Sequence, residues 1–447
     1  MLLGTAILLT GLVTATPVLE NTMPVRIAGP WTIEVGPGTV RGPGGAVKLA
    51  RPVTIEVPPP TPEHVEAEKH ERLRVFNPKT GGWMKGERLK ALIAQECTAT
   101  GALAPSSVVV RSAADDAIVY ERGKDYELDD LWATLGRIEG GRIGADTAVA
   151  IDYTFIPEHL HSVLYSEEGT RLALGEPGLA VVHPPARGKN ERVLLNIWVT
   201  ADTKELTEDN LFPLEQPNAR PLPEDPGQNA LRNFPRTLAK LRADEKVRIV
   251  AWGDSVTVGG GVLPDLEKRY QDQFLVLLKK QYPDAEIEII TAAWGGSNSA
   301  QWLEQPEGAE HHFQRDVLDP KPDLVTIEFV NDAYMTEEQT VEHYKMLFDR
   351  IKGAGAELIV LTPHLVRPDW MGVDTVKFDE DPRPYVKGLR RFTEEYNVGL
   401  ADASVEWCRL WRLGIPYTTL LGNAINHPDE RGHQIFANAL MKLFPAW

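Results

Sequence analysis

Polar residues with catalytic potential follow an apolar run in the C-terminal half of the chain. The run 247–252 ends at Gly253, Asp254 and Ser255, and the glycine-rich stretch 259–261 comes shortly afterwards. A serine that follows a buried strand and a sharp turn is well placed to act as a nucleophile. Its hydroxyl reacts only when a neighbouring base removes the proton, a task that histidine performs near neutral pH. Ser255 therefore needs a histidine and an oxyanion site from other parts of the chain.

Similar groups of polar residues follow later apolar runs. In a doubly wound parallel sheet the carboxyl ends of the strands meet at one edge, and active sites lie beyond that edge. We expect the polar residues that follow each strand to converge there with Ser255. They are Trp294, Gly296 and Asn298, then Asn331 and Asp332, then His364 and Arg367, and finally Asn423, Asn426 and His427. The set contains bases and amide donors that can bind an oxyanion.

Alternating strand and helix patterns predict the sheet that would bring these residues together. Besides the first run, strands are expected at 286–291, 323–329, 357–361 and 397–401. Helices are expected at 229–241, 266–282, 336–352 and 430–444, and Thr336 with Gln339 forms a capping box at the start of the third. This pattern predicts an α/β domain over residues 229–447, built on a doubly wound parallel sheet with right-handed crossovers.

The preceding part of the chain is different in character. Residues 23–200 show short alternating runs separated by Gly and Pro, which is typical of β-sandwich modules. We divide them into a small β region at 23–58 and a β-sandwich-like module at 63–200, with a helix expected at 86–94. The acidic, proline-rich stretch 201–228 is interpreted as a linker.

Composition excludes several classes of function. The chain has 447 residues and a net charge of -17, so it lacks the basic excess that binding to nucleic acid or an anionic membrane requires. Its length allows two or three domains. Cys97 and Cys408 are the two cysteines, and their wide separation predicts no structural disulfide and excludes a thiolate metal site.

The first residues resemble an export signal. Residues 1–16 form an uncharged apolar run that ends in small residues and is too short to span a bilayer. We interpret them as a secretory signal peptide, with cleavage after Ala15, and expect a periplasmic or extracellular protein without an integral membrane segment. A buried first strand or a wrongly assigned start is the alternative.

The order of the polar blocks resembles a known superfamily. Gly253-Asp254-Ser255, Gly296, Asn331-Asp332 and His427-Pro428 follow one another as in the SGNH/GDSL hydrolases, over about residues 247–447. The resemblance implies a flavodoxin-like, three-layer α/β sheet and ester hydrolysis through an acyl-serine, with no metal and no cofactor. It implies that Ser255 is the nucleophile and His427 the base. The N–H groups of Ser255 and Gly296 and the side chain of Asn331 would form the oxyanion hole.

Two positions depart from the pattern of that superfamily. Phe329 stands where its members usually have glycine, and Ala424 stands where they usually have the aspartate that orients the catalytic histidine. A backbone carbonyl, the side chain of Asn423 or Asn426, or the carboxylate of Asp402 is then a candidate to orient His427. A Ser–His dyad without an acid is the remaining alternative.

The expected function is hydrolysis of small acyl esters, with O-acetyl groups on carbohydrate as the expected substrate. Export, the added β modules and the absence of a long apolar lid favour this substrate. Trp294, Asn298, His364 and Arg367 are candidate substrate contacts, although a solvated loop is the alternative for His364 and Arg367. A non-catalytic carbohydrate- or surface-binding protein that retains the fold, or a lipid or thioester hydrolase, remains an alternative.

Overall fold

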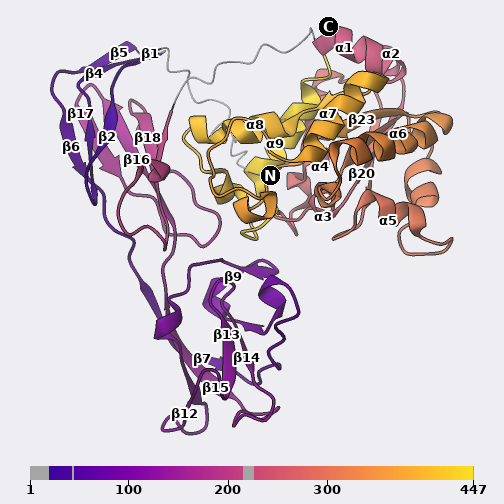
Figure 1. Ribbon diagram of the computed structural model, residues 1–447. Helices are drawn as coiled ribbons and strands as arrows, with labels where there is room; N and C mark the ends of the chain where they lie inside the picture. The colour runs from indigo at the N-terminus through magenta and orange to yellow at the C-terminus, as the bar shows by residue number, and fades with distance from the viewer. Residues whose placement is uncertain (1–19, 43–44, 215–225, 446–447) are drawn as a thin grey trace, which may run out of the picture. The chain divides into compact units, whose positions relative to one another are not determined.

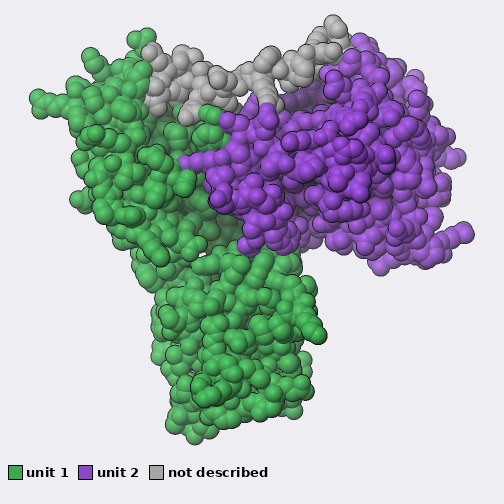
Figure 2. Space-filling view, viewed as in Figure 1, with its two compact units in different colours: residues 1–216, 411–425 green, residues 217–410, 426–447 purple. Residues whose placement is uncertain are grey.

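The chain forms two compact units. The computed structural model describes residues 20–42, 45–214 and 226–445, so the predicted signal peptide at 1–16 and part of the predicted linker lie outside the described residues. One unit comprises residues 1–216 and 411–425, and the other comprises residues 217–410 and 426–447 (Figure 2). We call them the N-terminal and the C-terminal unit.

The N-terminal unit is rich in β-strands. Its described strands form antiparallel sheets in the orders β1-β4-β5, β2-β3-β6, β17-β16-β18-β19, β12-β11-β15-β7, β13-β14-β8 and β10-β9. The strands are β1 Glu20–Asn21, β2 Val25–Gly29, β3 Thr32–Val35, β4 Gly38–Gly42, β5 Gly45–Leu49, β6 Val53–Glu56, β7 Glu63–His70, β8 Glu87–Arg88, β9 Ile93–Ala94, β10 Cys97–Thr98, β11 Val109–Ser112, β12 Val119–Tyr120, β13 Tyr126–Asp129, β14 Thr134–Arg137, β15 Val149–Phe155, β16 His159–Ser166, β17 Gly169–Ala173, β18 Arg192–Val199 and β19 Leu211–Pro213. The region is therefore β-rich, and its assignment as a β-sandwich stays a prediction.

Two separate hydrophobic cores stabilise this unit. In one core, Ile33 and Val35 of β3 pack with Leu195 and Ile197 of β18. Strands from both sides of the boundary predicted at residues 58–63 thus share one core. The other core lies among strands β7–β15 and includes Tyr153. The intervening segment therefore has its own core, while the segments before and after it fold together.

The prediction of a helix at 86–94 is wrong. Glu87 and Arg88 form strand β8, which pairs with β14, and Lys90–Leu92 is a single 3₁₀ turn. Gly86 explains this outcome, because a Cβ atom there would lie 2.6 Å from the backbone of Leu135. Pairing with β14 requires that close approach, and it overrides the local helical pattern.

A segment from late in the sequence also belongs to the N-terminal unit. Within 411–425, Leu413 forms a β-bridge with Leu214, and the carbonyl oxygen of Gly414 accepts a hydrogen bond from Asn196 Nδ2 at 2.7 Å. Ile425 is fully buried in a cluster with Cys97 and Trp132. These contacts, both apolar and polar, attach the segment to the β-strands of the N-terminal unit.

The C-terminal unit contains the predicted parallel sheet. Its five strands have the order β21-β20-β22-β23-β24, and every pair is parallel. The strands are β20 Val247–Gly253, β21 Ile287–Ala293, β22 Leu324–Glu328, β23 Glu357–Leu361 and β24 Gly399–Ala401. All residues of β22 and β23 are buried, which explains why most of them are apolar. The order 2-1-3-4-5 is that of a flavodoxin-like sheet.

Helices cover both faces of this sheet (Figure 1). Val250 and Trp252 of β20 share one core with Tyr344 of α6 and Leu389 of α7. Side chains alternate along a strand, so Ile249 and Ala251 point to the other face, where α4 contacts β21 and α9 contacts β23. The helices are α1 Pro226–Asn233, α2 Pro235–Arg242, α3 Ser255–Val258, α4 Tyr270–Gln281, α5 Ser299–Glu304, α6 Glu337–Gly353, α7 Pro384–Tyr396, α8 Ala403–Arg409 and α9 Glu430–Met441.

Capping explains where several helices begin. The capping box predicted for α6 is confirmed, because Thr336 Oγ1 accepts from Gln339 N at 3.2 Å and Gln339 Oε1 accepts from Thr336 N at 2.9 Å. The single helix expected at 229–241 is instead broken into α1 and α2, with Pro235 at the first position of α2. Proline suits that position but cannot continue a preceding helix.

The N-terminus of α2 is capped by a distant carboxylate. Glu357, at the start of β23, accepts hydrogen bonds from Arg236 N at 3.0 Å, Thr237 N at 2.8 Å and Thr237 Oγ1 at 2.7 Å. The side chain at the N-cap, Phe234, gives no cap bond. Glu357 therefore joins the helix to the sheet through two otherwise orphaned backbone N–H groups and one hydroxyl.

Substituting Glu357 tests this cap. We expect Glu357→Ala to lower the free energy of unfolding of the C-terminal unit by about 2 kcal/mol, because buried donors lose their acceptor. Glu357→Gln keeps one amide oxygen and should lose less. Urea unfolding followed by tryptophan fluorescence measures both, and equal losses in the two variants would contradict the role of the carboxylate.

Candidate functional site

Ser255 lies directly beyond the carboxyl end of strand β20, which pairs with β21 on one side and β22 on the other. It is the first residue of α3, and the preceding Asp254 caps this helix by accepting a hydrogen bond from Val256 N at 3.1 Å. The turn needs glycine at 253, because a Cβ atom there would lie 2.1 Å from Thr257 Oγ1. The strand end, the turn and the cap together hold the partly exposed Ser255 at the sheet edge.

His427 meets Ser255 at this edge. Its Nε2 atom lies 3.0 Å from Ser255 Oγ, although the two residues are 172 positions apart. His427 precedes α9, whose N-cap residue Asp429 accepts from Gly432 N at 3.1 Å. A neutral imidazole at this distance can take the serine proton, which is the first requirement for a nucleophilic hydroxyl.

The glycine-rich turn after α3 makes room for His427. A Cβ atom on Gly260 would lie 2.8 Å from the Cγ and Cδ2 atoms of His427, and one on Gly261 would lie 1.8 Å from the carbonyl oxygen of Pro428. Gly261 also has a φ of +94°, which disfavours other residues. These glycines therefore allow the turn after α3 to lie close to the segment that contains His427 and Pro428.

A second histidine, His433, fixes the same turn. Its Nε2 donates to the carbonyl oxygen of Gly260 at 3.0 Å, and its Nδ1 accepts from Tyr270 N at 3.2 Å. Burial lowers the pKa of His433 to about 4, so the ring is neutral near pH 7. His433 thus holds the backbone against which His427 packs.

The predicted oxyanion donors lie on neighbouring turns. Asn331 follows β22, and its N–H donates to Asp254 Oδ2 at 3.1 Å, which joins this turn to the one that carries Ser255. Asn331 Nδ2 donates to the carbonyl oxygen of Ser297 at 3.0 Å, and a primary amide has a second N–H. Gly296, with a φ of +76°, lies in the turn after β21. The N–H of Ser255 is the first of α3 and has no acceptor within that helix.

Three carboxyl groups are buried beneath these turns. Burial raises the pKa of Asp254, Glu328 and Asp332, and the charges of the three groups reinforce the effect on Asp254 and Glu328. Asp332 accepts hydrogen bonds from Ser299 N at 2.9 Å, Ser299 Oγ at 2.6 Å and Tyr344 Oη at 3.0 Å. Asp254 and Asp332 thus act as acceptors that tie turns together.

The candidate substrate contacts lie in different settings. Trp294, directly after β21, is partly exposed and stacks on His311 with ring centroids 5.1 Å apart. Asn298 caps α5, because its Oδ1 accepts from Gln301 N at 2.9 Å. Arg367 pairs with the exposed Asp369 through Nε at 2.5 Å. His364 is fully buried, which argues against direct contact with substrate.

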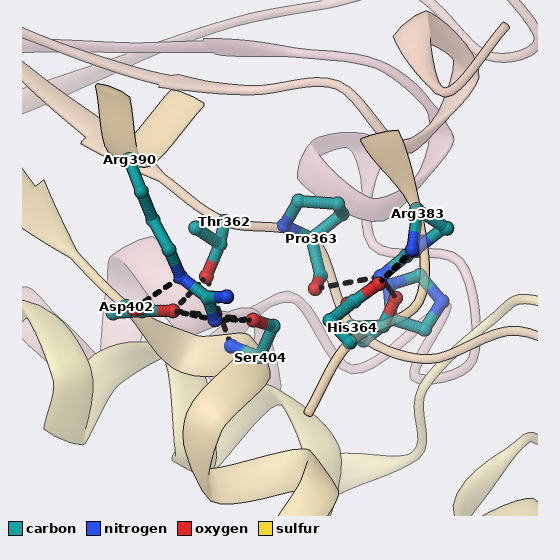
Figure 3. A network of polar contacts seen from close by, with 8 residues as sticks. Thr362, Pro363, His364, Arg383, Arg390, Asp402 and Ser404 are labelled. Atoms are coloured by element: carbon teal, nitrogen blue, oxygen red, sulfur yellow. Dashed lines mark hydrogen bonds and ion pairs between the residues drawn. The ribbon is translucent and has the colours of Figure 1, made fainter. Parts of the chain in front are cut away.

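Each candidate to orient His427 makes hydrogen bonds within its own surroundings. Both carboxylate oxygens of Asp402 bind Arg390, at 2.9 and 3.1 Å, and Thr362 and Ser404 also donate to Oδ1 (Figure 3). Asn423, in the N-terminal unit, donates from Nδ2 to Glu96 at 2.8 Å and accepts from Ile425 N at 3.0 Å. The carbonyl oxygen of Asn426 accepts from His364 Nε2 at 2.6 Å.

Sequence reasoning missed the supporting residues. The roles of Gly260, Gly261 and His433 depend on contacts across about 170 positions, and only the repeated glycines signalled a close approach. No group of three or more His, Cys, Asp or Glu side chains in the described ranges could hold a metal ion. Within the same ranges, no helix has the length and apolar character to cross a bilayer.

The close approach at Gly261 can be tested with a matched glycine. Gly308 has a φ of +88° and nothing within 4 Å of its would-be Cβ. We expect Gly308→Ala to cost about 1 kcal/mol of unfolding free energy from backbone strain alone. Gly261→Ala should cost about 3 kcal/mol or more, because Pro428 must also move. Chemical denaturation measures both, and similar costs would contradict the steric role.

Comparison with known proteins identifies the C-terminal region. Residues 251–435 match the GDSL-like Lipase/Acylhydrolase family. No curated protein sequence matches the chain significantly.

Solved structures with similarity to the chain share little sequence with it. A two-domain esterase active on acetylated mannans is 18% identical, with a TM-score of 0.39, and the match covers 49% of this chain and 53% of that one. The chain thus matches about half of that esterase. A catalytic mutant of an acetylxylan esterase from Geobacillus stearothermophilus is 20% identical (TM-score 0.36), covering 45% and 95% of the two chains. The lipase/acylhydrolase from Enterococcus faecalis is 18% identical (TM-score 0.32), covering 43% and 93%.

The family match begins within β20, includes Ser255, Asn331 and His427, and ends within α9. These are the strand ends and helix starts that form the sheet edge described above. Residues 251–435 therefore form a domain that matches the GDSL-like lipase/acylhydrolase family.

Proposed function

We propose that the chain is a serine esterase that works through an acyl-serine intermediate. Ser255 is the nucleophile and His427 the general base. The N–H groups of Ser255 and Gly296 and the amide of Asn331 stabilise the oxyanion. The observation that carries this proposal is the 3.0 Å distance between His427 Nε2 and Ser255 Oγ at the carboxyl edge of a parallel sheet.

The steps follow from these positions. His427 takes the proton of Ser255 as Oγ attacks the ester carbonyl carbon, and negative charge develops on the carbonyl oxygen. The imidazolium then gives that proton to the leaving alkoxide, which leaves an acyl-serine. Water attacks the acyl-serine with His427 again as base, and the acid and the free serine are released.

We further propose that the esters are small, with O-acetyl groups on carbohydrate as the substrate class of an exported protein. Aromatic residues on the chain segments that follow β21 and β22 support a sugar leaving group. Trp294 adjoins Gly295, whose would-be Cβ lies 4.0 Å from Ser255 Cβ. Tyr334 is 62% exposed only three residues after Asn331. Such rings offer flat apolar faces with polar edges, which suit sugar rings.

The nucleophile is tested by hydrolysis of p-nitrophenyl acetate. We expect Ser255→Ala to lower kcat at least about 10³-fold and to abolish labelling by a fluorophosphonate. Asn331→Ala should lower kcat about 10²-fold, because one oxyanion donor is lost. Ser166→Ala, in the N-terminal unit, is the control serine. Unchanged turnover and labelling in Ser255→Ala would refute the proposal.

The substrate class is tested by chain length and by polymer. We expect p-nitrophenyl acetate to be hydrolysed faster than the octanoate, and acetate to be released from acetylated xylan or mannan. Trp294→Ala should raise KM for the acetylated polysaccharide about tenfold and leave KM for p-nitrophenyl acetate unchanged. A preference for octanoate would instead favour a lipid esterase.

A further inference from the structure

His364 lies in the interior of the C-terminal unit, close to the chain segment that carries His427. It follows β23 by three residues and is fully buried. Its ring lies between two aromatic side chains, with centroids 5.5 Å from that of Trp407 and 6.0 Å from that of Phe436. A buried ring between two helices has little freedom to move.

The backbone of His364 is also held. Arg383 Nη2 donates to the carbonyl oxygen of His364 at 2.8 Å and to that of Pro363 at 3.3 Å (Figure 3). The same guanidinium pairs with the buried Asp381, at 2.9 Å from Nε and 2.6 Å from Nη2. Arg383 is only 5% exposed, so this clamp lies in the interior. The position of His364 is therefore fixed independently of His427.

The imidazole of His364 has a defined role as a donor. Its Nε2 lies 2.6 Å from the carbonyl oxygen of Asn426, which can only accept, so Nε2 carries the proton. Burial, with smaller contributions from the charges of Arg383, His427 and His433, lowers the pKa of His364 well below its usual range. The ring is thus neutral near pH 7, and the bond persists while neighbouring groups titrate.

Peptide planarity carries this restraint to His427. The carbonyl oxygen of Asn426 and the Cα atom of His427 belong to one peptide plane. A hydrogen bond that fixes the oxygen therefore restrains the Cα of His427, from which the ring reaches Ser255 at 3.0 Å. We propose that His364 is a positioning residue for His427 and supports the catalytic geometry in a chain that has Ala424 where its superfamily has aspartate. This inference rests on the proposed function of His427.

The donor is tested with two variants of His364. We expect His364→Leu, which keeps bulk but loses the donor, to lower kcat for p-nitrophenyl acetate about 10- to 100-fold with KM unchanged. The amide N–H of glutamine can occupy a place near Nε2, so His364→Gln should recover at least about fivefold of that loss. A change in KM alone, or no difference between the two variants, would overturn the proposal.

Two further measurements separate positioning from general damage. His364→Leu should lower kcat no further in a His427→Ala background, because it acts through His427, whereas multiplicative effects would overturn the proposal. His161→Leu is the control, since His161 is also buried and bonds a backbone group, Gly175 N at 3.1 Å, in the N-terminal unit. It should leave kcat unchanged.

A measurement that does not depend on catalysis distinguishes this inference from the proposed function. Hydrogen–deuterium exchange of the peptide 422–429 should accelerate at least about threefold in His364→Leu and not in His161→Leu. Unchanged exchange would overturn the positioning role even if Ser255 is the nucleophile. Accelerated exchange in a protein whose hydrolysis survives Ser255→Ala would refute the esterase mechanism and retain the structural restraint.

Discussion

The hydrogen bond between His427 and Ser255 imposes the main constraint on the C-terminal unit. It requires the segment before α9 to approach the turn after β20 within 3.0 Å from Nε2 to Oγ. That approach leaves no space for side chains at Gly260 and Gly261. It also requires a fixed backbone on both sides, which His433 and His364 provide through the carbonyl oxygens of Gly260 and Asn426. Much of the local sequence can thus be understood as support for one contact.

Buried polar groups supply this support at an energetic cost. Asp254 and Asp332 are fully buried, and burial raises the pKa of each carboxyl group because charge is poorly solvated in the interior. Each group offsets the cost by accepting hydrogen bonds from turns that must stay in register, such as those of Val256, Asn331 and Ser299. The buried carboxyl groups therefore lower the stability of the fold while they fix the positions of the turns, as is common at functional sites.

The N-terminal unit shows that order in the sequence does not define its cores. Ile33 and Leu195 lie in the same core, although the segment between β6 and β16 forms a separate one. Leu413 and Ile425 join the same unit from far along the chain. A core forms wherever apolar faces can cover one another, so a module boundary placed at a proline-rich break describes only the local chain.

The sequence by itself determined the parallel sheet and the places where polar residues must lie. Apolar runs such as 358–361 are buried on both faces, and the carboxyl ends of parallel strands share one edge, so Ser255, Asn331 and His364 were expected after strands of the sheet, and each of them follows one. The capping box of Thr336 and Gln339 could also be predicted from the sequence, because it depends on residues only three apart.

Tertiary structure alone decided what each polar residue does. His364 was a candidate substrate contact in sequence, yet packing by Trp407 and Phe436 and its bond to Asn426 make it an interior donor. Asp402 was a candidate partner of His427, yet Arg390 occupies both of its oxygens. The physical reason is that burial and hydrogen-bond partners depend on segments tens to hundreds of residues apart, which local patterns do not encode.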